Sequence, residues 1–324
     1  MFIVHSLPVA IAFCVITMLG WGSWANTQKL AGNQKWPFEL FYWDYAIGVL
    51  LFGILFAATF GSMGSDGMAA WTNLGSAGFG FILPALISGA IFNLSNILLV
   101  VGIDAAGMCV AFPVGVGLAL VIGTVESFVE KPQGNALLLF TGVGLIVFAM
   151  VMSALSHAKL PHGGGKKPLR GVIFSAVAGS IMGFFYPQLM RSISTEPGGL
   201  TPYVALVFFG VGVLGSNFLW NTIFMRAGRV TYAQYFAGSA RLHWIGILGG
   251  AIWMVALCFN VIASSVAGPA ISYALGQGAT LVAALWGLVV WREFRLAPVG
   301  TTKFIVLMLA GYTSGLILIG AATQ

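Results

Sequence analysis

The sequence is poor in charged residues. Asp, Glu, Lys and Arg make up only 7% of its 324 residues, whereas hydrophobic residues make up 59%. Soluble domains typically contain about 25% charged residues, so this composition excludes a soluble globular protein and predicts an integral membrane protein. The net charge of +6 is better explained by basic residues that set membrane topology than by nucleic-acid binding.

Cysteine is scarce as well. Cys14, Cys109 and Cys258 each lie inside an apolar run without the spacing of metal ligands, which predicts packing roles. The chain has no nucleophile paired with a base and no cluster of metal ligands. Its one glycine- and lysine-rich stretch, at 163–167, lacks the spacing of a phosphate-binding loop. An enzyme is therefore the weaker class, and no cofactor or metal is expected.

Apolar runs of about 20 residues recur along the whole chain, and each is long enough to cross a hydrocarbon core of about 30 Å as a helix. Because the runs are continuous and do not alternate, they predict helices and not the strands of a barrel. The fold expected is an all-α polytopic membrane protein with ten transmembrane helices, near 7–28, 40–61, 79–101, 107–129, 135–156, 170–190, 201–225, 243–264, 268–291 and 303–321.

Lys and Arg residues are distributed unequally between the two predicted faces. Twelve follow the odd-numbered helices, Lys166 among them, whereas only Lys131 and Arg191 lie on the other face. Cytoplasmic loops carry an excess of basic residues. The distribution therefore predicts a multi-pass protein of the cell (inner) membrane whose N- and C-termini are both extracytoplasmic.

An internal repeat divides the chain. The stretch Gly89-Ala-Ile-Phe92 returns 161 residues later as Gly250-Ala-Ile-Trp253, and Gly115 and Gly276 keep the same register. Five helices per half is an odd number, so the halves must be inverted in the membrane, an arrangement typical of carriers with alternating access. We expect a first five-helix repeat at 1–158, a cytoplasmic linker at 159–169 and a second, inverted repeat at 170–324.

Amides and aromatic rings at depth mark a candidate substrate site. Trp21 and Trp24 are three residues apart, so they share one face of the first helix, although an interfacial aromatic belt also explains Trp24. Buried amides need hydrogen-bond partners, which are either a ligand or a neighbouring helix. Indoles and amides together suit a neutral, planar or hydroxylated ligand. The predicted substrate-binding residues are Trp21, Trp24, Asn26, Asn93, Asn96, Asn217, Asn221, Tyr273 and Gln277.

Asp44 is the best-placed carboxylate at depth, about one turn into the second predicted helix. Phe41, Tyr42, Trp43 and Tyr45 surround it with rings that limit its hydration. Intramembrane carboxylates often relay protons, so Asp44 is the predicted proton-coupling residue. An ion pair with Lys29 or Lys35 is the alternative role, and His243 is the main rival for coupling.

Several motifs resemble a known family. Leu19-Gly-Trp-Gly-Ser-Trp24, Trp43-Asp44-Tyr45, Leu94-Ser-Asn96 and Val121-Ile-Gly-Thr124 look like the ureide permease family and the related glucose-ribose porters. The ten-helix, five-plus-five pattern resembles the wider drug/metabolite transporter (EamA-like) superfamily. The plant members of the ureide permease family carry a long central cytoplasmic loop, whereas this chain has only the short stretch from Gly163 to Arg170.

The resemblance implies a secondary active transporter for proton-coupled uptake of a small neutral polar metabolite, a ureide such as allantoin or a nucleobase. Proton symport of a sugar such as glucose, ribose or rhamnose is the alternative, and a channel or a membrane scaffold is the alternative from a different class. The expected partners are the substrate, protons and the lipid bilayer, with the protein as a monomer or homodimer.

Overall fold

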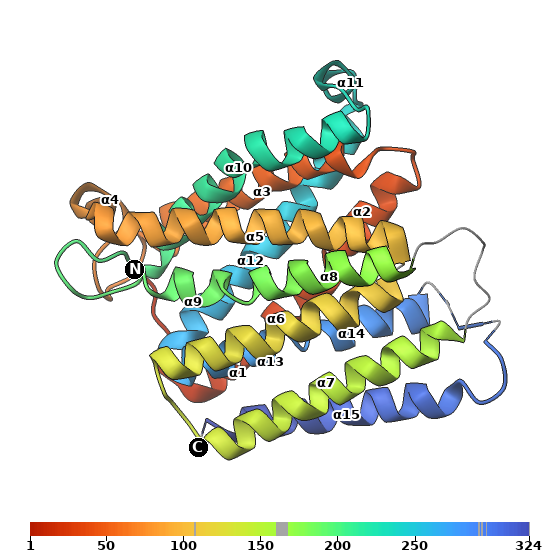
Figure 1. Cartoon of the computed structure of the whole chain (residues 1–324). Helices are drawn as coiled ribbons and strands as arrows, with labels where there is room; N and C mark the ends of the chain where they lie inside the picture. The colour runs from red at the N-terminus through yellow and green to blue at the C-terminus, as the bar shows by residue number, and fades with distance from the viewer. Residues whose placement is uncertain (107, 160–167, 291, 293, 296, 324) are drawn as a thin grey trace.

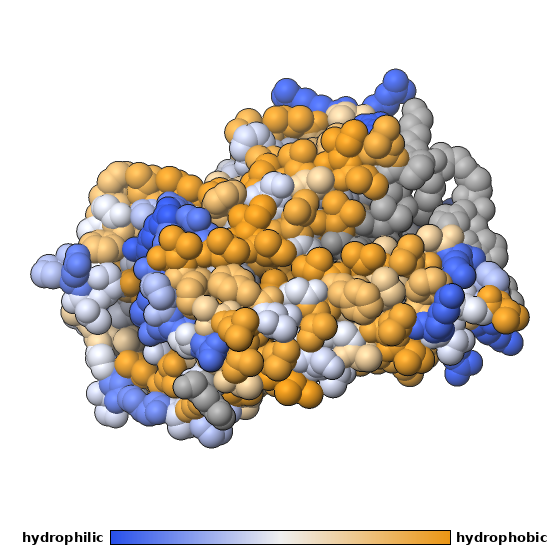
Figure 2. Space-filling view, turned by 60° about the horizontal axis from the view of Figure 1, so that its bottom comes forward, coloured by the Kyte–Doolittle hydropathy of each residue, from blue (hydrophilic) through white to orange (hydrophobic). Residues whose placement is uncertain are grey.

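A computed structural model describes residues 1–106, 108–159, 168–290, 292, 294–295 and 297–323. Within these residues the chain is helical and forms no named strand. Among the described residues, nine helical segments are long and apolar enough to cross a membrane, so the prediction of an all-α multi-pass membrane protein is confirmed. Figure 2 shows hydrophobic side chains over most of the middle of one face, with hydrophilic residues gathered toward its ends.

The first half of the chain runs back and forth through one bundle (Figure 1). Helix α5 contains Pro84, and α6 is one further long helix beside the nine candidate spans. In chain order the helices are α1 (Leu7–Ser23), α2 (Ala25–Gly32), α3 (Phe38–Ala58), the short α4 (Ala70–Ser76), α5 (Phe79–Ala106), α6 (Met108–Glu130) and α7 (Ala136–Ala158).

The second half of the chain also runs back and forth through this bundle (Figure 1). Two short elements in the chain, α4 and α11, lie outside the predicted windows. The helices of this half are α8 (Pro168–Met182), α9 (Phe185–Met190), α10 (Pro202–Ala227), α11 (Tyr232–Phe236), α12 (Ala240–Ala267), α13 (Pro269–Gly276), α14 (Ala279–Leu285), the π-helix η1 (Trp286–Val290) and α15 (Thr302–Ala321). Most of the predicted linker, residues 160–167 with Lys166, lies outside the described residues.

Both termini lie at one end of the bundle, called here the terminal end (Figure 1). The end of α7 and the start of α8, between which most of the predicted linker lies, are at the opposite end, called here the linker end. The short helix α11 is also at the linker end. Termini at the same end agree with an even number of crossings, and the number of ten stays a prediction.

Three predicted spans are interrupted by a break in the helix, and two of these breaks have a local cause. Between α8 and α9, Pro187 cannot donate a backbone hydrogen bond to the carbonyl four residues earlier, at Gly183. Between α1 and α2, the side chains of Asn26 and Thr27 donate to the backbone oxygens of Ser23 and Trp24, at 2.9 and 2.6 Å. Such bonds compete with the helix and bend it. The third interruption, between α13 and α14, falls at Gln277 and Gly278.

Helix packing is close where glycines face a neighbouring backbone. A Cβ atom on Gly250 of α12 would lie 2.0 Å from the backbone oxygen of Tyr45, and one on Gly89 of α5 would lie 2.2 Å from that of Phe209. The packing pairs recur in the two halves: α3 packs on α12 as α10 packs on α5, and α1 packs on α12 as α8 packs on α5. Helices α7 and α15 pack on each other at one edge.

Candidate functional site

A small cavity, called here the central cavity, lies at mid-depth in the bundle. Phe92 is the fourteenth of the 28 residues of α5, and Trp253 is the fourteenth of the 28 residues of α12. Their ring centroids are 4.1 Å apart. The interruptions of α1/α2 and α8/α9 both border this point. The lining residues are Trp21, Trp24, Phe92, Asn96, Leu99, Val116, Met182, Phe185, Trp253, Gln277, Ala279 and Thr280.

The central cavity is aromatic and uncharged. Trp21 stacks on Trp253 with ring centroids 5.8 Å apart and an angle of 20° between the planes. Asn96 and Gln277 supply amide groups, and none of the described residues that line the cavity is charged. The cavity holds about 60 Å³, far less than the roughly 300 Å³ or more of a typical ligand site. A metabolite therefore needs these walls to move apart.

Four of the predicted substrate-binding residues meet in this cavity: Trp21, Trp24, Asn96 and Gln277. The amide of Asn96 is fixed from behind, because its Nδ2 donates to the hydroxyl of Tyr42 at 2.9 Å. This bond uses one of the two N–H groups of the Asn96 amide. Trp24 also packs against Tyr45, with ring centroids 5.0 Å apart.

The other five predicted residues lie off the cavity and bond to protein. Asn26 donates to Ser23, within its own turn. Asn93 of α5 donates to Ser216 and Asn217 of α10, at 3.0 and 3.5 Å, and Asn221 donates to the backbone oxygen of Glu39, at 2.8 Å. Tyr273 donates to the backbone oxygen of Ala119, at 3.2 Å. The bonds of Asn93, Asn221 and Tyr273 join neighbouring helices, as buried polar side chains in membrane proteins commonly do.

Sequence reasoning missed the hydrophobic walls of the cavity, among them Phe92, Phe185, Trp253 and Met182. Apolar side chains are the ordinary content of a membrane helix, so nothing in their type distinguished them. The repeat did carry a signal for two of them, because Phe92 and Trp253 end the repeated stretches that begin at Gly89 and Gly250.

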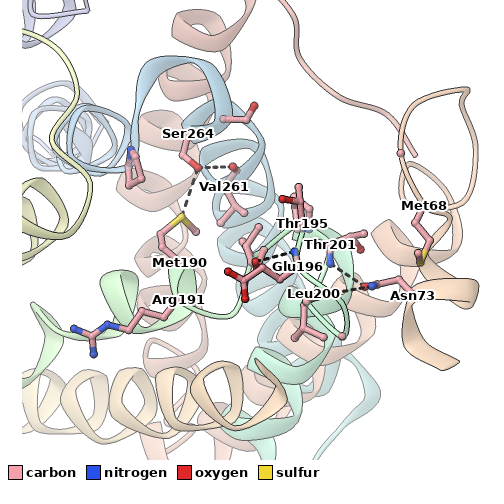
Figure 3. A pocket seen from close by; sticks show the side chains of 18 of the residues that line it. Met68, Asn73, Met190, Arg191, Thr195, Glu196, Leu200, Thr201, Val261 and Ser264 are labelled. Carbon is pink, nitrogen blue, oxygen red and sulfur yellow. Dashed lines mark hydrogen bonds between the residues drawn. The ribbon is translucent and has the colours of Figure 1, made fainter. Parts of the chain in front are cut away.

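A much wider cavity, called here the vestibule, opens at the terminal end and holds about 1150 Å³. Its walls come from the loop before α10 and from the ends of α6, α9 and α12. Figure 3 shows Met190, Val261 and Ser264 on one side of it and Asn73, Leu200 and Thr201 on the other. Arg191, at its rim, forms ion pairs with Glu126, at 3.2 Å, and with Glu130.

The two cavities approach each other at α9. Phe185 lines the central cavity and Pro187 lines the vestibule. Tyr186, which lies between them in the sequence, is fully buried, and its ring lies 5.0 Å from that of Tyr273.

An acid-base cluster lies on the linker side of the cavity. It consists of Asp44 on α3, Tyr235 on α11 and His243 on α12. The Tyr235 hydroxyl donates to Asp44 Oδ1 at 2.7 Å, and Nδ1 of His243 lies 2.9 Å from Oδ2. The Asp44 side chain is only 2% exposed. Burial, followed by the bond to Asp44, raises the pKa of Tyr235 above its ordinary value of 10.0, so this hydroxyl stays a donor at neutral pH.

The cluster joins two groups that sequence reasoning treated as rivals. Asp44 and His243 are partners in one pair. The signal for His243 was its place near the start of a helix facing Asp44. Nothing in the sequence indicated Tyr235, because α11 is a five-residue helix between two long ones.

The fold and the cavities define an all-helical, multi-pass membrane protein with a buried site at mid-depth. A sequence model of the family described as Ureide permease matches residues 41–167. Ureide permease 4 of Arabidopsis thaliana is 23% identical in an alignment that covers 100% of this chain and 99% of the relative. These matches relate the chain to the ureide permease family, as its motifs predicted.

Two further relatives from the same plant match over a shorter stretch. Ureide permease 2 and Ureide permease 1 are 27% and 24% identical, each over 48% of this chain and 40% of the relative. In those two comparisons the chain spans less than half the length of the relative. One solved crystal structure of a protein shares the fold, with 16% identity, a TM-score of 0.58 and coverage of 95% of this chain and 96% of the other.

Proposed function

We propose that the protein is a secondary active transporter that takes up a small, neutral, polar metabolite, a ureide such as allantoin or a nucleobase, together with protons. The observation that carries this proposal is the central cavity, an uncharged site of stacked indoles and amides at mid-depth between two interrupted helices. Flat rings and amides suit a planar ligand rich in N–H and C=O groups. The names of the relatives, which are ureide permeases, support the same substrate class.

Alternating access between two inverted halves is the proposed mechanism, with repeats at 1–158 and 170–324 joined by a cytoplasmic linker. The recurring pairs of packed helices and the matching glycine contacts support it. Inverted repeats carry their site near the midplane, formed by discontinuous helices, and α1/α2 and α8/α9 fit that description. The vestibule opens at the terminal end, whereas the acid-base cluster lies toward the linker end, and we propose that it closes the site on that side.

Proton coupling is assigned to Asp44, with His243 as its partner. The pair joins α3 of the first half to α12 of the second. Rocking of one half against the other would therefore separate the pair and expose the carboxylate to water. A proton taken up in one state and released in the other links its gradient to the direction of transport.

The proposed location is the inner cell membrane, with the vestibule and both termini outside. Reporter fusions after Gln324 and at residue 164 test this topology. The linker fusion should give the cytoplasmic signal. A cytoplasmic signal from the C-terminus would reverse the assignment of the vestibule.

Uptake into proteoliposomes tests the function. We expect saturable uptake of labelled allantoin or uracil, accelerated by a gradient that is acidic on the vestibule side. A parallel thermal-shift screen should include xanthine, glucose, ribose and rhamnose, because a ligand that binds only the folded state stabilises it by mass action. Stabilisation by sugars alone would favour the sugar alternative, flux without saturation would favour a channel, and absence of any flux would favour a scaffold.

A further inference from the structure

The indole nitrogen of Trp21 has no partner. Trp21 is 8% exposed, and its Nε1 is buried without a hydrogen-bond acceptor in the described part of the chain. A buried donor left unpaired is destabilising, and the cost is larger in a membrane, where no water replaces the partner. Buried groups of this kind need an explanation, and here the donor belongs to a wall of the central cavity.

The position of the ring is fixed on both sides. A Cβ atom on Gly276 of α13 would lie 2.8 Å from Cζ3 of Trp21, so the benzene edge of the indole is packed against that glycine. One face of the indole stacks on Trp253 of α12. The nitrogen is at the edge of the ring away from Cζ3, so neither contact satisfies it.

We infer that Trp21 and Trp253 form a clamp for a planar, uncharged ring, and that the N–H of Trp21 donates to a carbonyl oxygen of that ring. This inference rests on the proposed function and deepens it, because it names the chemistry that the site selects. A ring held between two faces needs about 7 Å, twice a carbon–carbon contact distance of about 3.5 Å. The two indoles stack on each other with their centroids 5.8 Å apart, so their faces must move apart before a ring can enter between them.

A second wall residue completes the recognition. Asn96 donates one N–H of its amide to the Tyr42 hydroxyl, and we assign its amide oxygen as the acceptor for a ring N–H. A cyclic ureide carries adjacent N–H and C=O groups in one plane, which matches an acceptor on one wall and a donor on another. A sugar presents hydroxyl groups around a puckered ring and gains less from two parallel faces.

Substitution of Trp21 by Phe tests the donor, because Phe keeps an aromatic wall and removes the N–H. Affinity for hydantoin, the cyclic core of a ureide, should be measured by calorimetry on the purified full-length protein. We expect Trp21→Phe to weaken binding about 3- to 10-fold, the scale of one net hydrogen bond. Trp220→Phe is the matched control, since Nε1 of Trp220 also lacks a partner in the described residues but lies outside the cavity.

Sulfur analogues locate the acceptor. Sulfur accepts hydrogen bonds more weakly than oxygen, so 2-thiohydantoin or 4-thiohydantoin should bind the wild type more weakly than hydantoin and should lose this difference in Trp21→Phe. Trp253→Leu should weaken hydantoin and both analogues alike. Equal affinity of wild type and Trp21→Phe for hydantoin would overturn the inference.

Binding of ribose or glucose in preference to hydantoin would also overturn it. These outcomes are separate from failure of the proposed function, which saturable uptake of any neutral metabolite tests independently. A protein that accumulates sugars but ignores hydantoin would keep the function as a carrier and lose the clamp.

Discussion

Nδ1 of His243 lies 2.9 Å from Oδ2 of Asp44, across the interface between α3 and α12. The same interface brings Gly246 against the Cβ of Asp44 and Gly250 against the backbone of Tyr45. At this close contact, where glycines of α12 face α3, the two helices also carry the pair of Asp44 and His243. A small change in the packing of α3 on α12 therefore acts directly on the pair.

Replacing Asp44 with Asn should separate binding from coupling. Asn keeps the shape of the side chain and can accept the hydrogen bond from Tyr235, but it has no proton to exchange at physiological pH. We expect Asp44→Asn to retain substrate binding and exchange while its acid-driven accumulation falls from about tenfold per pH unit, the value for one proton, to about onefold. In the same proteoliposomes, counterflow measures substrate exchange and gradient-driven uptake measures accumulation. Concentration of substrate by the mutant under a proton gradient would exclude Asp44.

Tyr235 should stabilise the acid-base cluster, but it should not determine how uptake depends on pH. Its raised pKa means that the neutral hydroxyl, and the stabilisation from its bond to Asp44, is fully present below pH 10.0 and is lost only as pH rises through the higher value in the folded state. Tyr235→Phe should lower stability by about 1 kcal/mol or more at every pH from about 5 to 8.

Uptake against pH checks this distinction. Tyr235→Phe should keep the shape of the wild-type profile over about pH 5 to 8, the range in which histidine and perturbed groups titrate, whereas Asp44→Asn should flatten it. A flat profile for Tyr235→Phe would assign the tyrosine to the proton pathway itself.

The buried amides should divide into two groups. Asn96→Ala and Gln277→Ala should weaken substrate binding by more than about 1 kcal/mol, the scale of a hydrogen bond, with little change in thermal stability. Asn221→Ala should do the reverse, because its amide holds α10 to the backbone of Glu39. The affinity measured by calorimetry and the melting temperature of each mutant distinguish the two groups. Loss of stability with unchanged affinity in Asn96→Ala would assign that residue to packing.

The glycine contacts should be sensitive to a single methyl group. Gly250→Ala would place a Cβ 2.0 Å from the backbone oxygen of Tyr45, whereas Gly215→Ala on α10 meets no atom within 4 Å. Overpacking a helix interface costs about 1–3 kcal/mol, so Gly250→Ala should melt earlier. Gly215→Ala should be neutral or slightly stabilising, by up to about 1 kcal/mol. Equal melting temperatures of Gly250→Ala and the wild type would mean that α12 moves to make room for the methyl group without loss of stability.

Helix positions could be predicted from the sequence because a membrane segment depends on length and hydrophobicity alone. Each predicted window overlaps a helix, from 7–28 to 303–321. The assignment of ten membrane spans, the inverted repeat and the wider superfamily remain predictions. The interruptions were harder to predict: Pro187 marked one, but the bend after Trp24 depends on local bonds from Asn26 and Thr27.

The site could be predicted only in part. Trp21, Trp24, Asn96 and Gln277 were found because polar and indole groups are rare at depth, and the structure brings them together. Asn93 and Asn221 carry the same chemistry but face neighbouring helices. Which face of a helix meets a cavity depends on tertiary packing, and residue type does not carry that information. For substrate contact, all nine residues remain predictions.

The small volume of the central cavity limits affinity as well as access. The central cavity holds about 60 Å³, far less than the roughly 300 Å³ or more of a typical ligand site, so a metabolite binds only to the population of the protein in which the walls have moved apart. The measured dissociation constant is then the intrinsic one divided by that population. Shortening Phe92, whose ring lies 4.1 Å from that of Trp253, would favour the wider form. Such a variant would bind its substrate more tightly and release it more slowly, so a gain in affinity would appear as a loss of turnover.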